Sequence, residues 1–148
     1  MIDNPSLTDS VLWIDREARI RRAIESLFTS HDIEVITARS SGEGLAHARV
    51  QLPKLIVVHN LAPRLEYYAI LAELRACAPL QGAFVFVADD PAAEGDASDL
   101  LAFGADATIE RPIDPDLVME VVAHVFADRL TSQPAPPAPA RRIRYRRD

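Results

Sequence analysis

Short apolar runs alternate five times with segments of helical periodicity between residues 11 and 130. The predicted strands are residues 11–14, 34–38, 55–58, 83–87 and 107–109, and the predicted helices are 17–29, 41–49, 65–76, 97–103 and 115–130. Because a helix follows each strand and carries the chain back across the sheet, the strands are expected to pair in parallel. The alternation predicts an α/β fold, a flavodoxin-like doubly wound (βα)5 with a five-stranded parallel sheet in the order 2-1-3-4-5.

Composition divides the 148 residues into four parts. Residues 1–9 are an N-terminal arm, and residues 10–130 are long enough to build a sizeable core. Residues 131–140 are rich in Pro and Ala, which is typical of an extended linker, and residues 141–148 form an Arg-rich tail.

The sequence shows no signal that would target the chain to a membrane or export it from the cytoplasm. Its N-terminus lacks the apolar segment of a signal peptide, and no apolar stretch approaches the roughly 20 residues that span a bilayer, so no transmembrane segment is expected. The single cysteine, Cys77, cannot close an internal disulfide, which suits a reducing compartment. We therefore expect a cytoplasmic protein.

Charge is distributed unevenly along the chain. The net charge is −6, yet residues 131–148 carry five arginines against one aspartate, so the remainder is strongly acidic. A basic tail on an acidic body is expected either to have an anionic partner or to fold back onto its own domain.

Two polar residues end the first and third predicted strands. Asp15 follows the run Val11–Ile14, and His59 follows Leu55–Val58, with Pro63 four positions later. In a doubly wound sheet the ligand crevice lies at the carboxyl ends of these two strands. The sequence therefore predicts that Asp15 and His59 face the same crevice.

These features resemble the receiver domain of response regulators, such as the chemotaxis receivers, over about residues 10–127. The segments that carry the resemblance are the strand and acidic turn Val11–Glu17, the stretch from His59 to Arg75, the Gly-Ala element Phe103–Asp106, and Arg111-Pro112 in place of a Lys-Pro pair. The resemblance implies a phosphorylation switch built on an aspartate and Mg²⁺. It also implies a partner surface on the fourth helix, fifth strand and fifth helix, here residues 96–127.

The switch residues that the family requires are replaced. His59 takes the place of the phospho-accepting Asp, Arg16 that of the second acid, and Thr108 that of the reporter aromatic. The other departures are Glu17, one place late for the acid pair, Val87 or Ala88 at the hydroxyl position, Arg111 for the Lys, and Tyr67 for a Gly. An imidazole cannot form an acyl phosphate, and a guanidinium beside the site repels Mg²⁺. We therefore expect a degenerate pseudo-receiver with no catalytic residues, no bound metal and no enzymatic activity.

Several roles remain open for the pocket residues. Asp15 could form an ion pair with Arg111. His59 could be a phosphohistidine, or share a metal with Asp15, but phosphotransfer needs an exposed ring and two ligands are too few for a metal. A hydrogen-bonded His59 filling the former acid pocket is favoured. Trp13 is expected in the core, and Tyr67 and Tyr68 in an exposed aromatic patch, although Tyr68 also fits a buried helical stripe with Leu65, Leu71 and Leu74.

The tail carries a second set of candidate residues. These are Arg141, Arg142, Arg144, Tyr145, Arg146, Arg147 and Asp148. Arginine forks bind phosphates and tyrosine stacks on bases. The tail resembles that of receiver-derived proteins that bind cyclic di-GMP through such a segment. A disordered charged end, or docking to an acidic protein, membrane or nucleic acid, are the alternatives.

The sequence thus predicts a phosphorylation-independent pseudo-receiver, an adaptor that contacts a signalling protein in a bacterial two-component-type pathway. The alternative is a receiver-like effector that responds to cyclic di-GMP through its tail. DNA regulation is not favoured, because the body is acidic and no DNA-binding domain is seen in the sequence.

Overall fold

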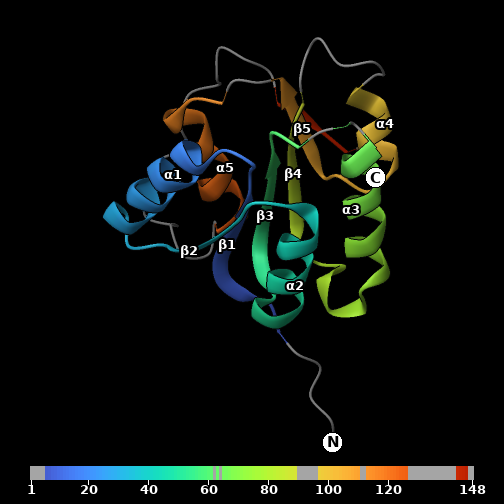
Figure 1. Cartoon of the computed structure of the whole chain (residues 1–148), viewed down its shortest axis with the longest axis horizontal. Helices are drawn as coiled ribbons and strands as arrows, with labels where there is room; N and C mark the ends of the chain where they lie inside the picture. Colours follow the sequence, from blue (N-terminus) through green and yellow to red (C-terminus); the bar gives the residue numbers. More distant parts are fainter. Residues whose placement is uncertain are drawn as a thin grey trace, which may run out of the picture.

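The computed structural model describes residues 6–61, 63, 65–89, 97–110, 113–126 and 143–146. They form a single sheet with helices on both faces (Figure 1). The strands are β1 (Thr8–Ile14), β2 (Glu34–Ala38), β3 (Pro53–His59), β4 (Phe84–Asp89), β5 (Ala107–Glu110) and β6 (Arg144–Tyr145). The helices are α1 (Ala18–Ser30), α2 (Ser41–Gln51), α3 (Leu65–Ala76), α4 (Ala97–Ala102) and α5 (Pro115–Val125), with a 3-10 turn, η1, at Ala78–Leu80.

The strand order is β2-β1-β3-β4-β5-β6. The first five strands are parallel, which confirms the predicted flavodoxin-like order. The sixth strand was not predicted, and it pairs antiparallel with β5. The sheet is therefore six-stranded rather than five-stranded, because part of the Arg-rich tail folds back onto its own domain.

Each face of the sheet is covered by its own layer of helices. Helices α2, α3 and α4 lie on one side and α1 and α5 on the other (Figure 1). Along β1, Leu12 and Ile14 pack into the first layer, whereas Val11 and Trp13 pack into the second. Burial on both faces explains why the strands appear in the sequence as continuous apolar runs, and Trp13 lies in the core as predicted.

Local sequence signals fix the helix ends. The Ser40 side chain caps α2 by accepting a hydrogen bond from the Glu43 amide at 3.1 Å, and Asp114 caps α5 from the Leu117 amide at 2.8 Å. Helix α4 ends at Ala102, and Gly104 follows it with a φ of +125°, which suits glycine just past a helix end. The Asp114 and Gly104 predictions are confirmed.

The register of α3 differs from the prediction. Its buried residues are Tyr67, Ile70, Leu71 and Leu74, whereas Leu65 is 71% exposed and Tyr68 is half-buried. The sequence could not separate the two stripes, because Leu71 and Leu74 belong to both. As a result Tyr67 points into the protein and does not join an exposed aromatic patch.

Four of the predicted segments fall partly or wholly outside the described residues: the first five residues of the N-terminal arm, residues 127–130 of the last predicted helix, the linker 131–140, and residues 141–142 and 147–148 of the tail. Strand β1 already begins at Thr8, within the predicted arm, where the Thr8 amide donates to the Leu52 carbonyl. Within the described part of the chain, the helices are too short or too polar to cross a membrane.

Two glycines in α2 provide a matched test of this packing. A Cβ on Gly44 would lie 2.5 Å from Cδ1 and 2.7 Å from Cγ1 of the fully buried Ile14, whereas a Cβ on Gly42 would meet nothing within 4 Å. We expect Gly44→Ala to lower the free energy of unfolding by about 1–3 kcal/mol, because α2 must move away from β1. Gly42→Ala should instead stabilise by about 0.5 kcal/mol. Urea unfolding of both variants measures the difference, and equal effects would contradict the close approach of α2 to β1.

Candidate functional site: the crevice at the carboxyl ends of β1 and β3

The sheet brings Asp15 and His59 together at one edge. Strands β1 and β3 are neighbours with Ile14 opposite Val58, so the residues that follow them lie side by side. The His59 Nδ1 atom lies 2.6 Å from Asp15 Oδ2. Asp15 is fully buried and His59 is 6% exposed. The predictions that Asp15 and His59 face one crevice and that His59 is hydrogen-bonded are confirmed, and the partner of His59, which the sequence left open, is Asp15.

The Asp15 carboxylate has no free acceptor site. Its Oδ1 accepts from the Glu17 amide at 2.9 Å and from Asn60 Nδ2 at 3.3 Å. Its Oδ2 accepts from His59 and from Trp13 Nε1 at 3.3 Å. A carboxylate offers about four acceptor positions, so these four donors use them all. The tautomer of His59 follows, because a hydrogen bond to an ionised carboxylate requires the proton on Nδ1.

Burial and hydrogen bonding act in opposite directions on this carboxyl group. Burial raises the pKa of Asp15, but hydrogen bonds from His59 and the Glu17 amide, the charge of His59 and the contact with Trp13 outweigh it. The net result is a pKa below the ordinary value of 3.8, so Asp15 is ionised at neutral pH.

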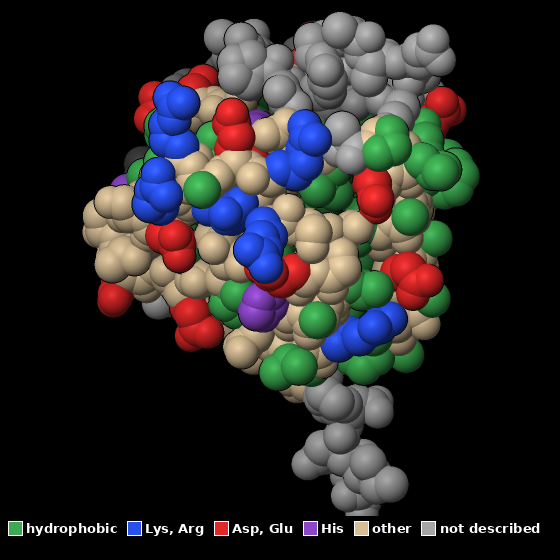
Figure 2. Space-filling model, in the orientation of Figure 1, with side chains coloured by type: hydrophobic (Ala, Val, Ile, Leu, Met, Phe, Trp, Pro, Cys, Tyr) green, Lys and Arg blue, Asp and Glu red, His purple; other side chains and the backbone are tan. Residues whose placement is uncertain are grey.

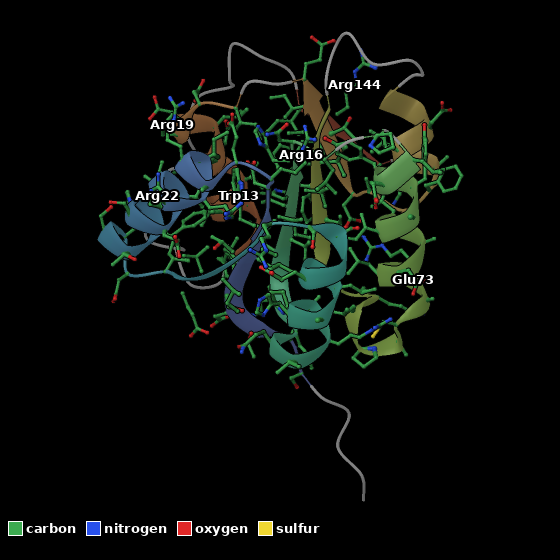
Figure 3. The ribbon with its side chains drawn as sticks, viewed as in Figure 1. Trp13, Arg16, Arg19, Arg22, Glu73 and Arg144 are labelled. Atoms are coloured by element: carbon green, nitrogen blue, oxygen red, sulfur yellow. The ribbon has the colours of Figure 1, made fainter. Side chains whose placement is uncertain are left out.

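Arginines surround the mouth of the crevice. Arg16 Nε donates to the Asn60 carbonyl at 3.0 Å, and Arg21 Nη1 donates to the Asp15 carbonyl at 2.7 Å. Figure 3 shows Arg16 near the carboxyl end of β3, with Trp13 deeper in the fold, and Arg19 and Arg22 along α1. In Figure 2 the basic side chains gather over α1 and the adjoining end of the sheet. Acidic side chains lie among them, and the position expected for a second acid is occupied by the Arg16 guanidinium.

Tyr67 closes the crevice from the side of α3. Its phenol oxygen accepts a hydrogen bond from the Leu61 amide at 3.0 Å and donates one to the Ala88 carbonyl at 3.4 Å. It is only 3% exposed. The phenol thereby joins the carboxyl ends of β3 and β4. In the family resemblance, these are the positions of the phospho-acceptor, here His59, and of the hydroxyl residue, here Val87 or Ala88.

Of the remaining predicted pocket residues, two are apolar, one is exposed, one is a buried threonine and one lies outside the described part. Val87 and Ala88 are fully buried in β4, and the Glu17 side chain is exposed. Thr108 is fully buried in β5, and its hydroxyl has no hydrogen-bond partner among the described residues. Arg111 lies outside the described residues, so its ion pair with Asp15 stays a prediction.

The crevice does not suit the Mg²⁺ ion that the resemblance implies. Magnesium needs several oxygen ligands in near-octahedral geometry. Here both oxygens of Asp15 are already used, the facing residue is the imidazole of His59, and the Arg16 guanidinium lies at the mouth. Within the described ranges, no three His, Cys, Asp or Glu side chains come together as a metal site.

The structure places the three described tail candidates away from this crevice. Arg144 and Tyr145 form β6 at the far edge of the sheet, and Arg146 is paired with Asp106 at 2.9 Å. The remaining four tail candidates, Arg141, Arg142, Arg147 and Asp148, lie outside the described residues. Binding of cyclic di-GMP by the tail stays a prediction.

Solved structures share this architecture. The chemotaxis response regulator CheY4 of Vibrio cholerae aligns with a TM-score of 0.71 and 18% identity over 80% of this chain and 99% of that one. A CheY-like receiver domain protein from Methanospirillum hungatei aligns with a TM-score of 0.71 and 23% identity over 86% and 100% of the two chains. The chain has the fold of a response-regulator receiver domain.

Curated sequences point the same way. The receiver-like region matches the response regulator Rre1 of Synechocystis at 28% identity over 127 residues, 85% of this chain and 55% of that protein. It matches the probable transcriptional regulator ycf27 of Porphyra purpurea at 39% identity over 67 residues, 45% of this chain and 28% of that protein. The chain thus spans about half the length, or less, of these relatives. A scan against protein-family models found no match.

Two functional residues of this receiver fold were missed or misjudged from the sequence. Asn60 holds both Asp15 and Arg16 while adopting a φ of +58°, which asparagine tolerates better than most residues. Tyr67 was noted as a departure, but its part in closing the crevice was not foreseen. The signal available in the sequence was Tyr67 itself, a large side chain where the family has a Gly.

The titration of Asp15 gives a testable pH dependence. Its pKa is lower in the folded chain than in the unfolded one, so its stabilising effect is complete above the unfolded value and is lost as the pH falls through the folded value. At neutral pH, Asp15→Asn should lower the free energy of unfolding by about 1–3 kcal/mol. The gap from wild type should stay constant above about pH 5 and narrow below it.

Urea unfolding at a series of pH values measures this gap. The exposed Asp116, in the first turn of α5, supplies the control: Asp116→Asn should change stability by only about 0.5 kcal/mol. A gap for Asp15→Asn that widens on acidification would contradict the assigned direction of the pKa shift.

Removing the Tyr67 hydroxyl tests whether the phenol closes the crevice. In Tyr67→Phe the buried Leu61 amide loses its acceptor, which should cost about 1–3 kcal/mol of stability. Amide hydrogen exchange should also speed up at Leu61 more than at the amides of β3. Unchanged exchange at Leu61 would show that this hydrogen bond does not hold the end of the strand.

Proposed function

We propose that this protein is a phosphorylation-independent pseudo-receiver, a non-enzymatic adaptor in a two-component-type signalling pathway. The observation that carries the proposal is the saturated Asp15–His59 pair. In an active receiver the equivalent crevice must leave carboxylate oxygens free for Mg²⁺ and for nucleophilic attack on phosphorus. Here the chain's own hydrogen-bond donors use them.

Phosphorylation of His59 has less support than an inert pocket. A phosphohistidine requires a ring nitrogen that a donor can reach. His59 is 6% exposed, its Nδ1 is engaged by Asp15, and its ring lies 5.9 Å from that of Trp13. These contacts favour a structural role for the His59 imidazole, which takes the place of both the metal ion and the phospho-accepting aspartate.

The adaptor role rests on what the fold retains. With the crevice filled, the helices and the edge of the sheet are the surfaces through which the domain can act. The partner surface is the region of the fourth helix, fifth strand and fifth helix, residues 96–127, and the partner is a signalling protein. We place the protein in the cytoplasm, where such pathways operate.

Incubation with a phosphoryl donor tests the inert pocket directly. Acetyl phosphate or beryllofluoride with Mg²⁺ should produce no adduct and no Mg²⁺-dependent amide shifts at Asp15 or His59. The detection method is intact-mass spectrometry together with two-dimensional NMR. An ordinary receiver domain, treated in parallel, provides the positive control.

A matched variant checks that the named residues are responsible. Arg16→Asp, His59→Asp and Tyr67→Gly combined restore the second acid, the acceptor and the open crevice. This variant, if circular dichroism shows it folded, should gain Mg²⁺-dependent shifts in the crevice. A phosphoryl adduct on the wild-type chain, at a rate like that of the control receiver, would refute the proposed function.

A further inference from the structure

The outer edge of β5 is covered by the chain's own tail. Tyr145 lies opposite Ala107 and Arg144 opposite Thr108 in an antiparallel ladder. The Arg146 amide extends it by donating to the Asp106 carbonyl at 2.6 Å. An uncovered edge strand would present its backbone donors and acceptors to any extended segment. Without residues 143–146, β5 would be such an edge.

The seat beside this edge is aromatic. The Tyr145 ring lies 5.2 Å from the ring of His124 on α5 and 6.4 Å from Phe84 on β4. Phe84 and His124 also contact each other at 5.5 Å, so the two form a continuous support. Ile143 packs against the core cluster of α1, α5 and the sheet. The apolar Ile143 and the aromatic Tyr145, two positions apart, therefore both contact the domain.

A charge completes the seat. Asp106 Oδ2 accepts from Arg75 Nη2 at 2.6 Å and from the Val85 amide at 2.8 Å, which fixes the carboxylate. Its Oδ1 faces outward and pairs with Arg146 at 2.9 Å. The fixed carboxylate selects a basic residue next to the aromatic one.

We propose that the β5 edge, with Phe84, His124 and Asp106, is a strand-addition site for an extended, basic and aromatic segment of a partner protein, and that residues 143–146 occupy it as an internal competitor. Main-chain pairing would supply affinity, and the aromatic seat and carboxylate would supply specificity. The inference deepens the proposed adaptor role, since it names the surface and the kind of partner.

The contacts that hold residues 143–146 on β5 are few, which favours a segment that a partner can displace. β6 is only two residues long, both are exposed, and residues 127–142 separate it from the described end of α5. The two core clusters of the domain are built almost entirely by other elements, with Ile143 as the tail's contribution. Segments with so few buried contacts open at low free-energy cost. Because a tethered tail can have an effective concentration on the order of 1 mM, a partner segment must bind the edge more tightly than the tail does.

Peptide binding to the full chain tests this site. The probe is a fluorescent peptide with the sequence of residues 141–148, and a second peptide carries Ser in place of Tyr145. The proteins are wild type, the tail variant Tyr145→Ser/Arg146→Ser, and a control with similar changes elsewhere, Val50→Ser/Arg22→Ser. Val50 and Arg22 are exposed on α2 and α1, away from β5.

We expect the probe to bind the tail variant at least about tenfold more tightly than wild type or the control, because its own tail no longer competes. NMR shifts should map to residues 106–108 and His124, and the Ser peptide should bind more weakly. Equal affinity for all three proteins, shifts elsewhere, or no binding to the tail variant would overturn the proposal. Wild type that forms a dimer in light scattering, with tails exchanged between copies, would also overturn it in favour of a second copy as occupant.

This experiment is independent of the pocket chemistry. Failure of the peptide to bind leaves the inert Asp15–His59 pocket intact, and a phosphoryl adduct in the donor assay leaves the peptide result intact. The two proposals can therefore fail separately.

Discussion

An ionised carboxylate buried among apolar side chains is the constraint that organises the carboxyl end of this sheet. Left alone, such a charge costs several kcal/mol. Asp15 avoids that cost through His59, Trp13, Asn60 and the Glu17 amide. These partners come from within β1, the end of β3 and the start of α1. A single carboxylate therefore fixes three elements relative to one another.

Tyr67 extends the same organisation to β4. Its hydroxyl joins the Leu61 amide, just past β3, to the Ala88 carbonyl. Arg16 closes the mouth by binding the Asn60 carbonyl. A crevice that in a doubly wound sheet usually receives a ligand has here become part of the hydrogen-bonded interior. Because Asp15, His59 and Tyr67 are all hydrogen-bonded within the chain, the same contacts that make this end of the sheet rigid are the basis of the proposed loss of phosphorylation.

Much of the fold and the meeting of Asp15 and His59 at one crevice could be predicted, because they depend on local periodicity and on strand ends that a parallel sheet brings together. What could not be predicted depends on side-chain direction and tertiary partners. The buried face of α3 was predicted to include Tyr68 in place of Tyr67, since Leu71 and Leu74 belong to either face. That ambiguity concealed the inward position of Tyr67. β6 was missed because Arg144 and Tyr145 carry no strand pattern of their own and pair only where an edge is already available.

Strand β5 connects the crevice to the edge of the sheet where the tail pairs. In an active receiver, a phosphoryl group in the crevice is reported by an aromatic residue on this strand. The corresponding residue here is Thr108, fully buried and opposite Arg144 of the tail. A small side chain in that place has no ring to turn between two positions. Under the proposed function, a change at the β5 face would come from outside the crevice, and residues 143–146 are held there by the partly buried Ile143, the Tyr145 ring contacts and the Arg146 ion pair.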